Sequence, residues 1–303
     1  MNFTHPIDLH WTGRPKSIAA ALLRDGKFAA LIDPGPSSTL PRLREQLREQ
    51  NVSVAGLQAI FLTHIHLDHA GAAGTLVREN PALRVYVHSK GAPHLIDPAK
   101  LLESSRRLFG EDRDRLFGEF LAVPMENLEI LEGGEVVATG SRELRVFYTP
   151  GHASHHVTYF EPNDSVAFVG DTTGISVQGD AFVLPAMPPP DVSMELWDAS
   201  LDLISGLNAR KLFLTHFGFS ERVPEHIESF RKRLHLWSET AEEIGRRNLT
   251  AEESSRIFSE VVAAEAARFL SQEQLAHYLF NGALPLSWLG LERYHRKKSA
   301  AVK

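Results

Sequence analysis

Phe61-Leu-Thr-His-Ile-His-Leu-Asp-His-Ala-Gly71 is the stretch that decides the fold of this chain, because an apolar run leads directly into a dense set of metal-binding side chains. His64 and His66 are two positions apart, so on an extended segment they point the same way and can bind one cation. Asp68 and His69 fall where the chain turns toward the next helix and can bind a second cation nearby. Three imidazoles and a carboxylate suit zinc, iron or manganese, and cysteine ligands are excluded because the chain has no cysteine.

The composition of the chain is that of an ordinary globular protein. Its 303 residues are 43% hydrophobic and 23% charged, which suits one large domain or a domain with an appendage. The net charge of −6 argues against a nucleic-acid partner. The N-terminal residues lack a basic segment followed by an apolar one, and no apolar run reaches the length of a membrane span. We therefore expect a cytoplasmic protein with no membrane partner.

The first part of the chain alternates strands and helices. Apolar runs at 17–23 and 28–33 flank Asp25-Gly26, which supplies the turn of a tight hairpin. A helix with one apolar face follows over 40–50, and the apolar run 57–62 is expected to be a strand buried on both faces. A helix over 71–79 and a strand over 84–88 are predicted next.

Helical sequence at 91–120 interrupts the succession of strands. We interpret it as an insertion near the mouth of the site, and a helix pair packed elsewhere on the surface is the alternative. Residues 174–192 include Val183-Leu-Pro-Ala-Met-Pro-Pro-Pro190, which is too rich in proline for a helix or a central strand. We expect a long ordered loop there, acting either as a lid or as a passive connector.

Short apolar runs separated by Gly, Pro and Asn-Asp breaks predict further strands with antiparallel pairing. These strands cover 128–131, 136–139, 144–148, 156–160 and 166–169. An amphipathic helix over 194–207 and a short strand over 211–214 follow.

Only helices are predicted after Phe219. Six apolar residues recur there at spacings of three and four and form one stripe along a helix. They are Ile227, Phe230, Leu234, Trp237, Ala241 and Ile244. Thr250-Ala-Glu-Glu253 and Ser271-Gln-Glu-Gln274 are capping boxes that start two more helices. We expect the stripe to dock on the preceding domain or on its sister helices, and a homodimer formed through it is the alternative.

Three later stretches each place a ligand-type residue directly after a predicted strand. They are Tyr148-Thr-Pro-Gly-His152, Phe168-Val-Gly-Asp171 and Phe213-Leu-Thr-His216. Strand ends hold side chains rigidly enough to bind a metal, and a preceding Gly permits a close approach of the backbone. One strand-end histidine alone is usually structural, but the ordered set behind the first motif predicts that these residues complete one site.

The motifs together resemble the metallo-β-lactamase superfamily of metallohydrolases, over about residues 1–219. The matching motifs are Leu31-Ile-Asp-Pro-Gly35, His64-Ile-His-Leu-Asp-His69, Thr149-Pro-Gly-His152, Val169-Gly-Asp-Thr-Thr-Gly174 and Leu214-Thr-His-Phe-Gly218. The resemblance implies an α/β fold, an αβ/βα four-layer sandwich of two mixed β-sheets flanked by helices. We therefore expect a catalytic domain over 1–219 with a helical insertion at about 91–120, and an all-helical C-terminal extension over 220–303.

The resemblance also implies that two divalent cations share seven ligands. One cation takes His64, His66 and His152, the other takes Asp68, His69 and His216, and Asp171 bridges both. Zinc is the expected ion, with iron or manganese as alternatives.

Five further residues are assigned supporting roles. By the resemblance, Asp33 supports the metal loops and His156 lies behind the ligands. For His88, His94 and His155, proximity to the predicted site is the only indication of a supporting role, and we expect structural roles for them.

The chemistry that the resemblance implies is that of a glyoxalase II-like dinuclear hydrolase. A metal-bridging hydroxide would attack a small ester, thioester or lactone, because two cations lower the pKa of a shared water toward about 7. Asp68 is the candidate catalytic residue, which orients the hydroxide and passes a proton to the leaving group. Phe182, Leu184 and Met187 are the candidate lining of an apolar acyl pocket for this small-molecule substrate.

Other activities stay open at this point. Gly174 stands where an acyl-homoserine lactonase would carry a tyrosine, and the basic glutathione-binding residues of glyoxalase II have no match that we identify. A mononuclear iron dioxygenase resembling persulfide dioxygenase would use only His64, His152 and Asp171. A phosphodiesterase of the same superfamily and a metal-stabilised protein without turnover are further alternatives.

Overall fold

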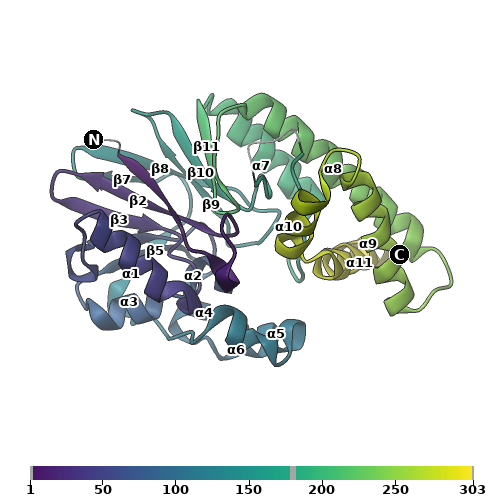
Figure 1. The fold of residues 1–303 in the computed structure, drawn as a ribbon, viewed down its shortest axis with the longest axis horizontal. Helices are drawn as coiled ribbons and strands as arrows, with labels where there is room; N and C mark the ends of the chain where they lie inside the picture. Colours follow the sequence, from purple (N-terminus) through teal and green to yellow (C-terminus); the bar gives the residue numbers. More distant parts are fainter. Residues whose placement is uncertain (1–2, 178–181, 302–303) are drawn as a thin grey trace.

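The structure, a computed structural model, describes residues 3–177 and 182–301. Two six-stranded mixed β-sheets face each other, with helices on the outer faces and a further group of helices at the C-terminal end of the chain (Figure 1). The predicted fold class, an αβ/βα sandwich of two mixed sheets with a C-terminal helical extension, is confirmed.

The first sheet has the strand order β1-β2-β3-β4-β5-β6. Pairing is antiparallel from β1 to β3 and parallel from β3 to β6. The strands are β1 (Thr4–Asp8), β2 (Ala19–Asp25), β3 (Phe28–Ile32), β4 (Ala59–Phe61), β5 (Arg84–His88) and β6 (Leu128–Leu131).

The second sheet has the order β12-β11-β10-β9-β8-β7. Its pairs are antiparallel except for β10 with β11, so the predicted antiparallel pairing from β7 to β10 is confirmed. For residues 128–131 the prediction is wrong, because β6 follows the helical insertion and pairs parallel with β5 in the first sheet. The strands are β7 (Val136–Thr139), β8 (Arg142–Tyr148), β9 (Val157–Glu161), β10 (Val166–Gly170), β11 (Lys211–Leu214) and β12 (Gly218–Ser220).

The predicted opening hairpin is present, and both faces of β2 are buried. Asp25 pairs with Phe28 across a turn in which Gly26 has a φ of 59°, a conformation that glycine adopts without strain. Alternate residues of β2 serve two cores, as a strand between two layers requires. Ala19, Ala21 and Leu23 belong to the core between the sheets, whereas Ala20 and Leu22 belong to the core under the outer helices.

Helices lie on the outer face of each sheet (Figure 1). Those in the first half of the chain are α1 (Leu40–Glu49), α2 (Leu67–Ala70), α3 (Ala73–Glu79), α4 (Ala92–Ile96), α5 (Ala99–Phe109) and α6 (Asp112–Phe117). The last three lie between β5 and β6, where the sequence predicts a helical insertion. The second sheet carries α7 (Met194–Gly206). Short 3₁₀ helices occur at Trp11–Gly13, Ser37–Thr39, Val54–Gly56 and Met125–Asn127.

The C-terminal extension contains α8 (Val223–Gly245), α9 (Ala251–Ala266), α10 (Gln272–Gly282) and α11 (Leu284–Ala301). Both predicted capping boxes are present, at Thr250 with Glu253 and at Ser271 with Gln274. No helix in 3–177 or 182–301 has both the length and the apolarity needed to cross a membrane.

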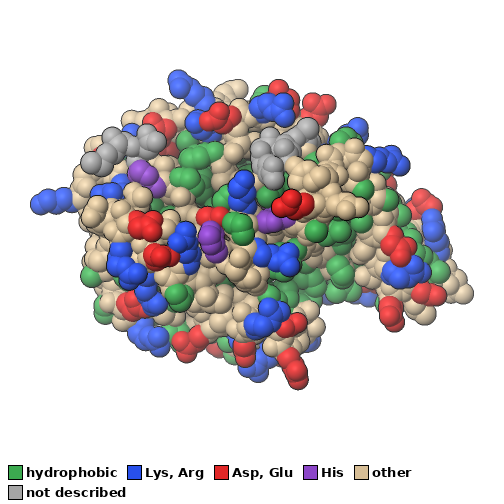
Figure 2. Space-filling view, viewed as in Figure 1, with side chains coloured by type: hydrophobic (Ala, Val, Ile, Leu, Met, Phe, Trp, Pro, Cys, Tyr) green, Lys and Arg blue, Asp and Glu red, His purple; other side chains and the backbone are tan. Residues whose placement is uncertain are grey.

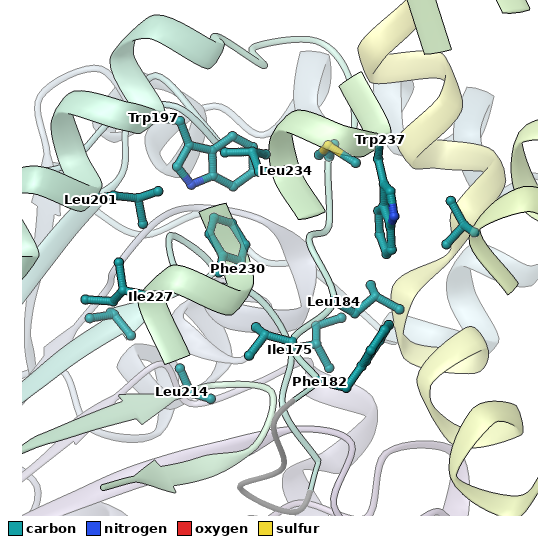
Figure 3. Packing of buried hydrophobic residues seen from close by; sticks show 14 of the residues in the cluster. Ile175, Phe182, Leu184, Trp197, Leu201, Leu214, Ile227, Phe230, Leu234 and Trp237 are labelled. Atoms are coloured by element: carbon teal, nitrogen blue, oxygen red, sulfur yellow. The ribbon is translucent and has the colours of Figure 1, made fainter. Parts of the chain in front are cut away.

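The predicted apolar stripe of α8 is buried within this chain. Its residues share one core with Val169 and Leu212 of the second sheet and with Trp197 of α7, and Figure 3 shows Phe230 beside Trp197. The stripe therefore packs on the preceding domain. The alternative of a homodimer stays a prediction, and it would need another surface.

The proline-rich segment after Gly174 is an ordered loop where the structure describes it, and the C-terminal helices hold it in place. Ile175 and Leu184 form an isolated β-bridge. The Tyr278 hydroxyl donates to the Phe182 carbonyl at 3.1 Å, and the Met187 amide donates to the Ser287 hydroxyl at 3.1 Å. Residues 178–181 of this predicted loop lie outside the described residues.

Candidate metal centre

Four strand ends meet at one edge of the sandwich and carry the predicted ligands. The first motif follows β4, His152 follows β8, Asp171 follows β10 directly, and His216 follows β11. The first motif continues into the short helix α2, which places Asp68 and His69 in its single turn. All seven predicted ligands thus come together in space, although they span some 150 positions of the chain.

His64, His66 and His152 form the first ligand group. The Nδ1 atom of His66 lies 2.9 Å from His64 Nε2 and 3.1 Å from His152 Nε2. Nitrogen ligands at 2.0–2.1 Å from a tetrahedral zinc lie roughly 3.3 Å apart, so these three nitrogens converge at close to a metal-binding spacing.

Asp68, His69 and His216 form the second ligand group. The Oδ2 atom of Asp68 lies 3.3 Å from His216 Nε2 and 3.8 Å from His69 Nε2. One carboxylate and two imidazoles make a donor set that suits zinc and also accepts iron or manganese.

Asp171 lies between the two groups and presents one oxygen to each. Its Oδ2 atom is 3.4 Å from His152 Nε2 in the first group. Its Oδ1 atom is 3.3 Å from His69 Nε2 and 3.6 Å from His216 Nε2 in the second group. The arrangement matches the bridging position that the resemblance implies for this residue.

Backbone and side-chain oxygens orient three of the imidazoles. His152 Nδ1 donates to the Ala186 carbonyl at 2.9 Å, and His216 Nδ1 donates to the Ser17 carbonyl at 2.7 Å. His69 Nδ1 lies 2.8 Å from a carboxylate oxygen of Asp33. Each contact places the proton on Nδ1 and leaves the Nε2 lone pair directed into the centre.

Asp33 holds together two of the loops that carry ligands, the one after β4 and the one after β11. Besides His69, its carboxylate accepts hydrogen bonds from the Thr63 amide at 2.8 Å and the Thr63 hydroxyl at 2.7 Å. The Thr215 hydroxyl donates to it at 2.9 Å. Thr63 and Thr215 immediately precede ligands, so this one buried carboxylate sets the relative positions of His64, His69 and His216.

Neither threonine is among the residues predicted above, although the sequence contains a signal for both. Phe61-Leu-Thr-His64 and Phe213-Leu-Thr-His216 are identical tetrapeptides at the ends of β4 and β11. A repeated Thr-His pair at two strand ends indicates a common hydrogen-bond acceptor.

His156 supports the backbone of Asp171, as its predicted position behind the ligands implies. The Asp171 amide donates to His156 Nε2 at 3.3 Å, and His156 Nδ1 lies 3.0 Å from the Thr172 hydroxyl. Gly170 has a φ of 48°, and a Cβ atom there would lie 2.5 Å from Thr63 Oγ1 and 2.6 Å from His156 Nε2. Only glycine therefore fits between these supports.

Burial keeps the first group of imidazoles neutral. It lowers the pKa of His64 well below its ordinary value and lowers the pKa of His66 to about 4. Burial also lowers the pKa of His152. A neutral imidazole is the form that binds a metal, so this group is ready to do so near pH 7.

The second group has the opposite electrostatic character. Burial disfavours the charged form of His69. The carboxylates of Asp171, Asp68 and Asp33 outweigh this effect and raise the pKa of His69 well above its ordinary value. His69 in turn lowers the pKa of Asp68 to about 2 against the effect of burial, and it holds the pKa of Asp171 well below its ordinary value. Buried carboxylates this close together require a positive charge among them, which a bound cation supplies.

Unpaired atoms at the centre fit the same conclusion. His69 Nε2 and Asp171 Oδ1 are buried, face each other at 3.3 Å, and have no hydrogen-bond partner within the described ranges. A buried polar atom without a partner is costly, and metal coordination satisfies both. The residues present therefore fit the two cations that the resemblance implies.

A pocket of about 360 Å³ opens at the metal centre, and part of the predicted insertion lines it. Five ligands reach its wall, together with residues of α5, of the proline-rich loop and of α10–α11. The ligands are His66, Asp68, His152, Asp171 and His216. His94 and His155 also line the pocket and therefore lie beside the site. His88 instead stacks on Tyr148 at a centroid distance of 4.4 Å.

Phe182, Leu184 and Met187 lie elsewhere. Their exposed fractions are 1%, 0% and 0%, and they pack in the core that the second sheet forms with α8 and α10–α11. Figure 3 shows Phe182 and Leu184 in this core. The sequence-based assignment of these side chains to an acyl pocket is not supported, because the C-terminal helices cover them. Their neighbours Ala186 and Pro188 line the pocket instead.

The chain is an αβ/βα sandwich whose paired groups of histidines and aspartates fit a metal site. A family model of the metallo-β-lactamase superfamily matches residues 13–216, more than half of the chain. The chain belongs to the metallo-β-lactamase superfamily.

Two curated relatives show how far the likeness extends. The chain is 32% identical over 207 residues to a metallo-β-lactamase fold-containing protein of Sulfurisphaera tokodaii, covering 67% of this chain and 74% of that protein. It is 33% identical over 142 residues to the hydroxyacylglutathione hydrolase of Maricaulis maris, covering 46% of this chain and 44% of that enzyme. The chain thus matches less than half of the length of that hydrolase.

A solved structure shares the fold over nearly the whole chain. It is a metallo-β-lactamase family protein from Thermus thermophilus, with a TM-score of 0.73 and 22% identity. The match covers 98% of this chain and 94% of that one, so the shared fold includes the C-terminal helices.

Proposed function

We propose that this protein is a dinuclear metal-dependent hydrolase that acts on a small ester, thioester or lactone. The observation that carries the proposal is the position of Asp171, whose two oxygens lie 3.4 Å from His152 Nε2 and 3.3 Å from His69 Nε2. A carboxylate between two complete ligand groups is typical of sites that hold a pair of cations. An oxygenase with a single iron would leave the second ligand group, Asp68, His69 and His216, without a metal to bind.

Zinc is the ion we propose, because the donors are imidazoles and carboxylates, and iron or manganese are the alternatives. When bound, two divalent cations lower the pKa of a water molecule and polarise the carbonyl oxygen of the substrate. The chain itself maintains the geometry of the donors, through Asp33 and through the carbonyls that orient His152 and His216.

Asp68 is the residue to which we assign a direct part in the reaction. Its side chain is 25% exposed and lines the pocket, and its pKa of about 2 keeps it ionised. An ionised carboxylate here can accept a hydrogen bond from the attacking water and orient it, and we also assign to Asp68 the transfer of a proton to the leaving group.

The relatives support hydrolysis and suggest the order of testing. Hydroxyacylglutathione hydrolases cleave a thioester by their name, and the superfamily model that matches residues 13–216 spans all of the ligand motifs. Thioesters are therefore the first substrates to test, followed by lactones, esters and phosphodiesters.

The test combines metal analysis with turnover. We expect the purified protein, loaded with zinc, manganese or iron, to hold two metals per chain and to hydrolyse one of these substrate classes. Activity should disappear when a chelator removes the metals and return when they are restored. One iron per chain with oxygen consumption would establish the dioxygenase instead, and no turnover in any class would contradict the proposal.

A further inference from the structure

One wall of the pocket is apolar and comes from three separate segments of the chain. Trp11 belongs to the turn after β1, Phe109 and Phe117 to α5 and α6, and Phe280 to α10. The Trp11 ring lies 5.7 Å from Phe117 and 5.5 Å from Phe280, and Phe109 lies 4.9 Å from Phe117, measured between centroids. We call these four rings the aromatic wall. It joins the sandwich, the insertion and the C-terminal extension around one cavity.

One face of α5 continues this wall. Leu101, Ser105 and Leu108 are spaced as neighbours on one side of a helix, and all three line the pocket. In Figure 2 hydrophobic side chains are concentrated on the surface where the C-terminal helices face α5. An apolar surface that belongs to a cavity and also reaches the metal ligands is suited to the non-reacting part of a substrate.

Several polar groups on these walls are already engaged by the protein. The Trp11 indole nitrogen donates to the Leu116 carbonyl at 2.7 Å, and the Ser105 hydroxyl donates to the Leu102 carbonyl at 2.9 Å. The Ser287 hydroxyl accepts from the Met187 amide at 3.1 Å. These hydrogen bonds turn three polar atoms toward the protein, so hydrocarbon and ring surface faces the cavity at these positions. The side chains of Lys100 and Asn281 also line the pocket and supply polar groups there.

We propose that the substrate carries an extended apolar acyl group, and that this group lies against the aromatic wall and the α5 face that continues it, while its carbonyl carbon is at the metal centre. The inference rests on the proposed hydrolase function and narrows its substrate class. The volume of about 360 Å³ is within the range of roughly 300–1,000 Å³ found for small-ligand pockets. Phe280 and Leu108 become specificity-determining residues, and the insertion and the C-terminal extension act together in substrate selection.

Straight-chain carboxylates, the products of such a reaction, test the inference without turnover. Calorimetry should show that affinity rises from acetate through butanoate to octanoate. From butanoate to octanoate the rise should be about tenfold to 200-fold, because four methylenes are added and each contributes up to about fourfold when fully buried. The measurement uses both metal-loaded and metal-free protein, because the chain-length dependence comes from the walls. Affinity that is independent of chain length would overturn the inference.

Two variants and a matched control locate the acyl group. Leu108→Trp fills the cavity and Phe280→Ala removes one ring, so each should reduce the octanoate-to-acetate affinity ratio about tenfold or more. Leu289→Ala removes a leucine on α11 that is 39% exposed and outside the pocket, and it should leave the ratio unchanged. Equal ratios in all four proteins would contradict the assignment of these walls, and the Leu108 variant serves if Phe280→Ala does not fold.

Hydrolysis of the same acyl series separates this inference from the proposed function. Turnover of acetyl and octanoyl thioesters with equal kcat/KM would uphold the hydrolase and overturn the acyl pocket. Chain-length-dependent binding without any turnover would uphold the pocket and overturn the hydrolase.

Discussion

Asp33 and His69 are joined by a buried contact of 2.8 Å between carboxylate oxygen and Nδ1, and this contact directs the Nε2 atom of His69 toward the second ligand group. Asp33 contributes no atom to either group of ligands. It nevertheless sets the positions of three of them, because it also accepts hydrogen bonds from Thr63 and Thr215. The precision of the centre thus depends on a residue more than 30 positions before the first ligand.

Asp33→Asn is expected to weaken metal binding. Asparagine tolerates the positive φ of 48° at this position, but its amide cannot accept every hydrogen bond that the carboxylate accepts. Loss of such a support typically reduces metal affinity or activity by about 10–100-fold. Competition with a chromophoric chelator measures the change, with Asp198→Asn on α7 as a control outside the site. Wild-type affinity in Asp33→Asn would refute the role assigned to this residue.

Asp171→Ala is expected to change the metal stoichiometry. Because each oxygen of Asp171 faces a different ligand group, its removal takes one donor from both. We expect occupancy to fall from two metals to at most one per chain after dialysis, with loss of hydrolysis. Elemental analysis beside a turnover assay provides the measurement. A variant that keeps two metals and full activity would show that Asp171 does not bridge.

Gly170→Ala is expected to destabilise the folded protein by about 1–3 kcal/mol, because of the positive φ and the close approach of Thr63 and His156. Gly206→Ala is the matched control, since nothing lies within 4 Å of a Cβ atom there and φ is not positive. Alanine at 206, at the end of α7, should be neutral or stabilising by up to about 1 kcal/mol. Urea denaturation of both variants compares their free energies of unfolding. Similar values for the two would contradict the tight fit at Gly170.

Acidification is expected to destabilise the protein in part through His226. This α8 residue is 4% exposed, and burial lowers its pKa from 6.5 to about 4, although the hydrogen bond to the Thr173 carbonyl acts in the opposite direction. The folded protein keeps His226 neutral while the unfolded chain protonates it, so its contribution is fully present above pH 6.5 and is lost as the pH falls toward 4. The loss amounts to roughly 3 kcal/mol.

His226→Gln tests this pH dependence. Glutamine can still donate to the Thr173 carbonyl but does not titrate, so the free energy of unfolding of the variant should fall less steeply between pH 6.5 and 4. Denaturation curves across this range, with exposed His10→Gln as a control, give the comparison. Parallel pH profiles for wild type and His226→Gln would show that His226 is not responsible.

The local features of this protein are readable from its sequence. The hairpin at Asp25-Gly26, the capping boxes at Thr250 and Ser271 and the α8 stripe each depend on residues a few positions apart, and the structure contains all of them. The ligand residues are readable for a related reason. Each one follows a short apolar strand, and strands of this kind end at a common edge of a sheet.

The surroundings of the centre required the tertiary structure. Phe182, Leu184 and Met187 have the composition of a pocket wall, but α8, α10 and α11 cover them, and no local pattern records which loop a distant helix will cover. Conversely, Phe280 has no feature that marks it as a pocket residue, and Leu108 is marked only by its place in the predicted insertion. They reach the site because the insertion and the C-terminal extension, which are far apart in the sequence, both contribute to the walls of the pocket.

The amino-acid sequence by itself thus determined the donors, the strands that carry them and the family to which the chain belongs, since these depend on residue type and short-range spacing. Tertiary packing alone decided which side chains surround the centre and therefore which substrates can reach it. The physical reason is that burial depends on the docking of segments up to 270 residues apart, such as Trp11 and Phe280, which are brought to a centroid distance of 5.5 Å.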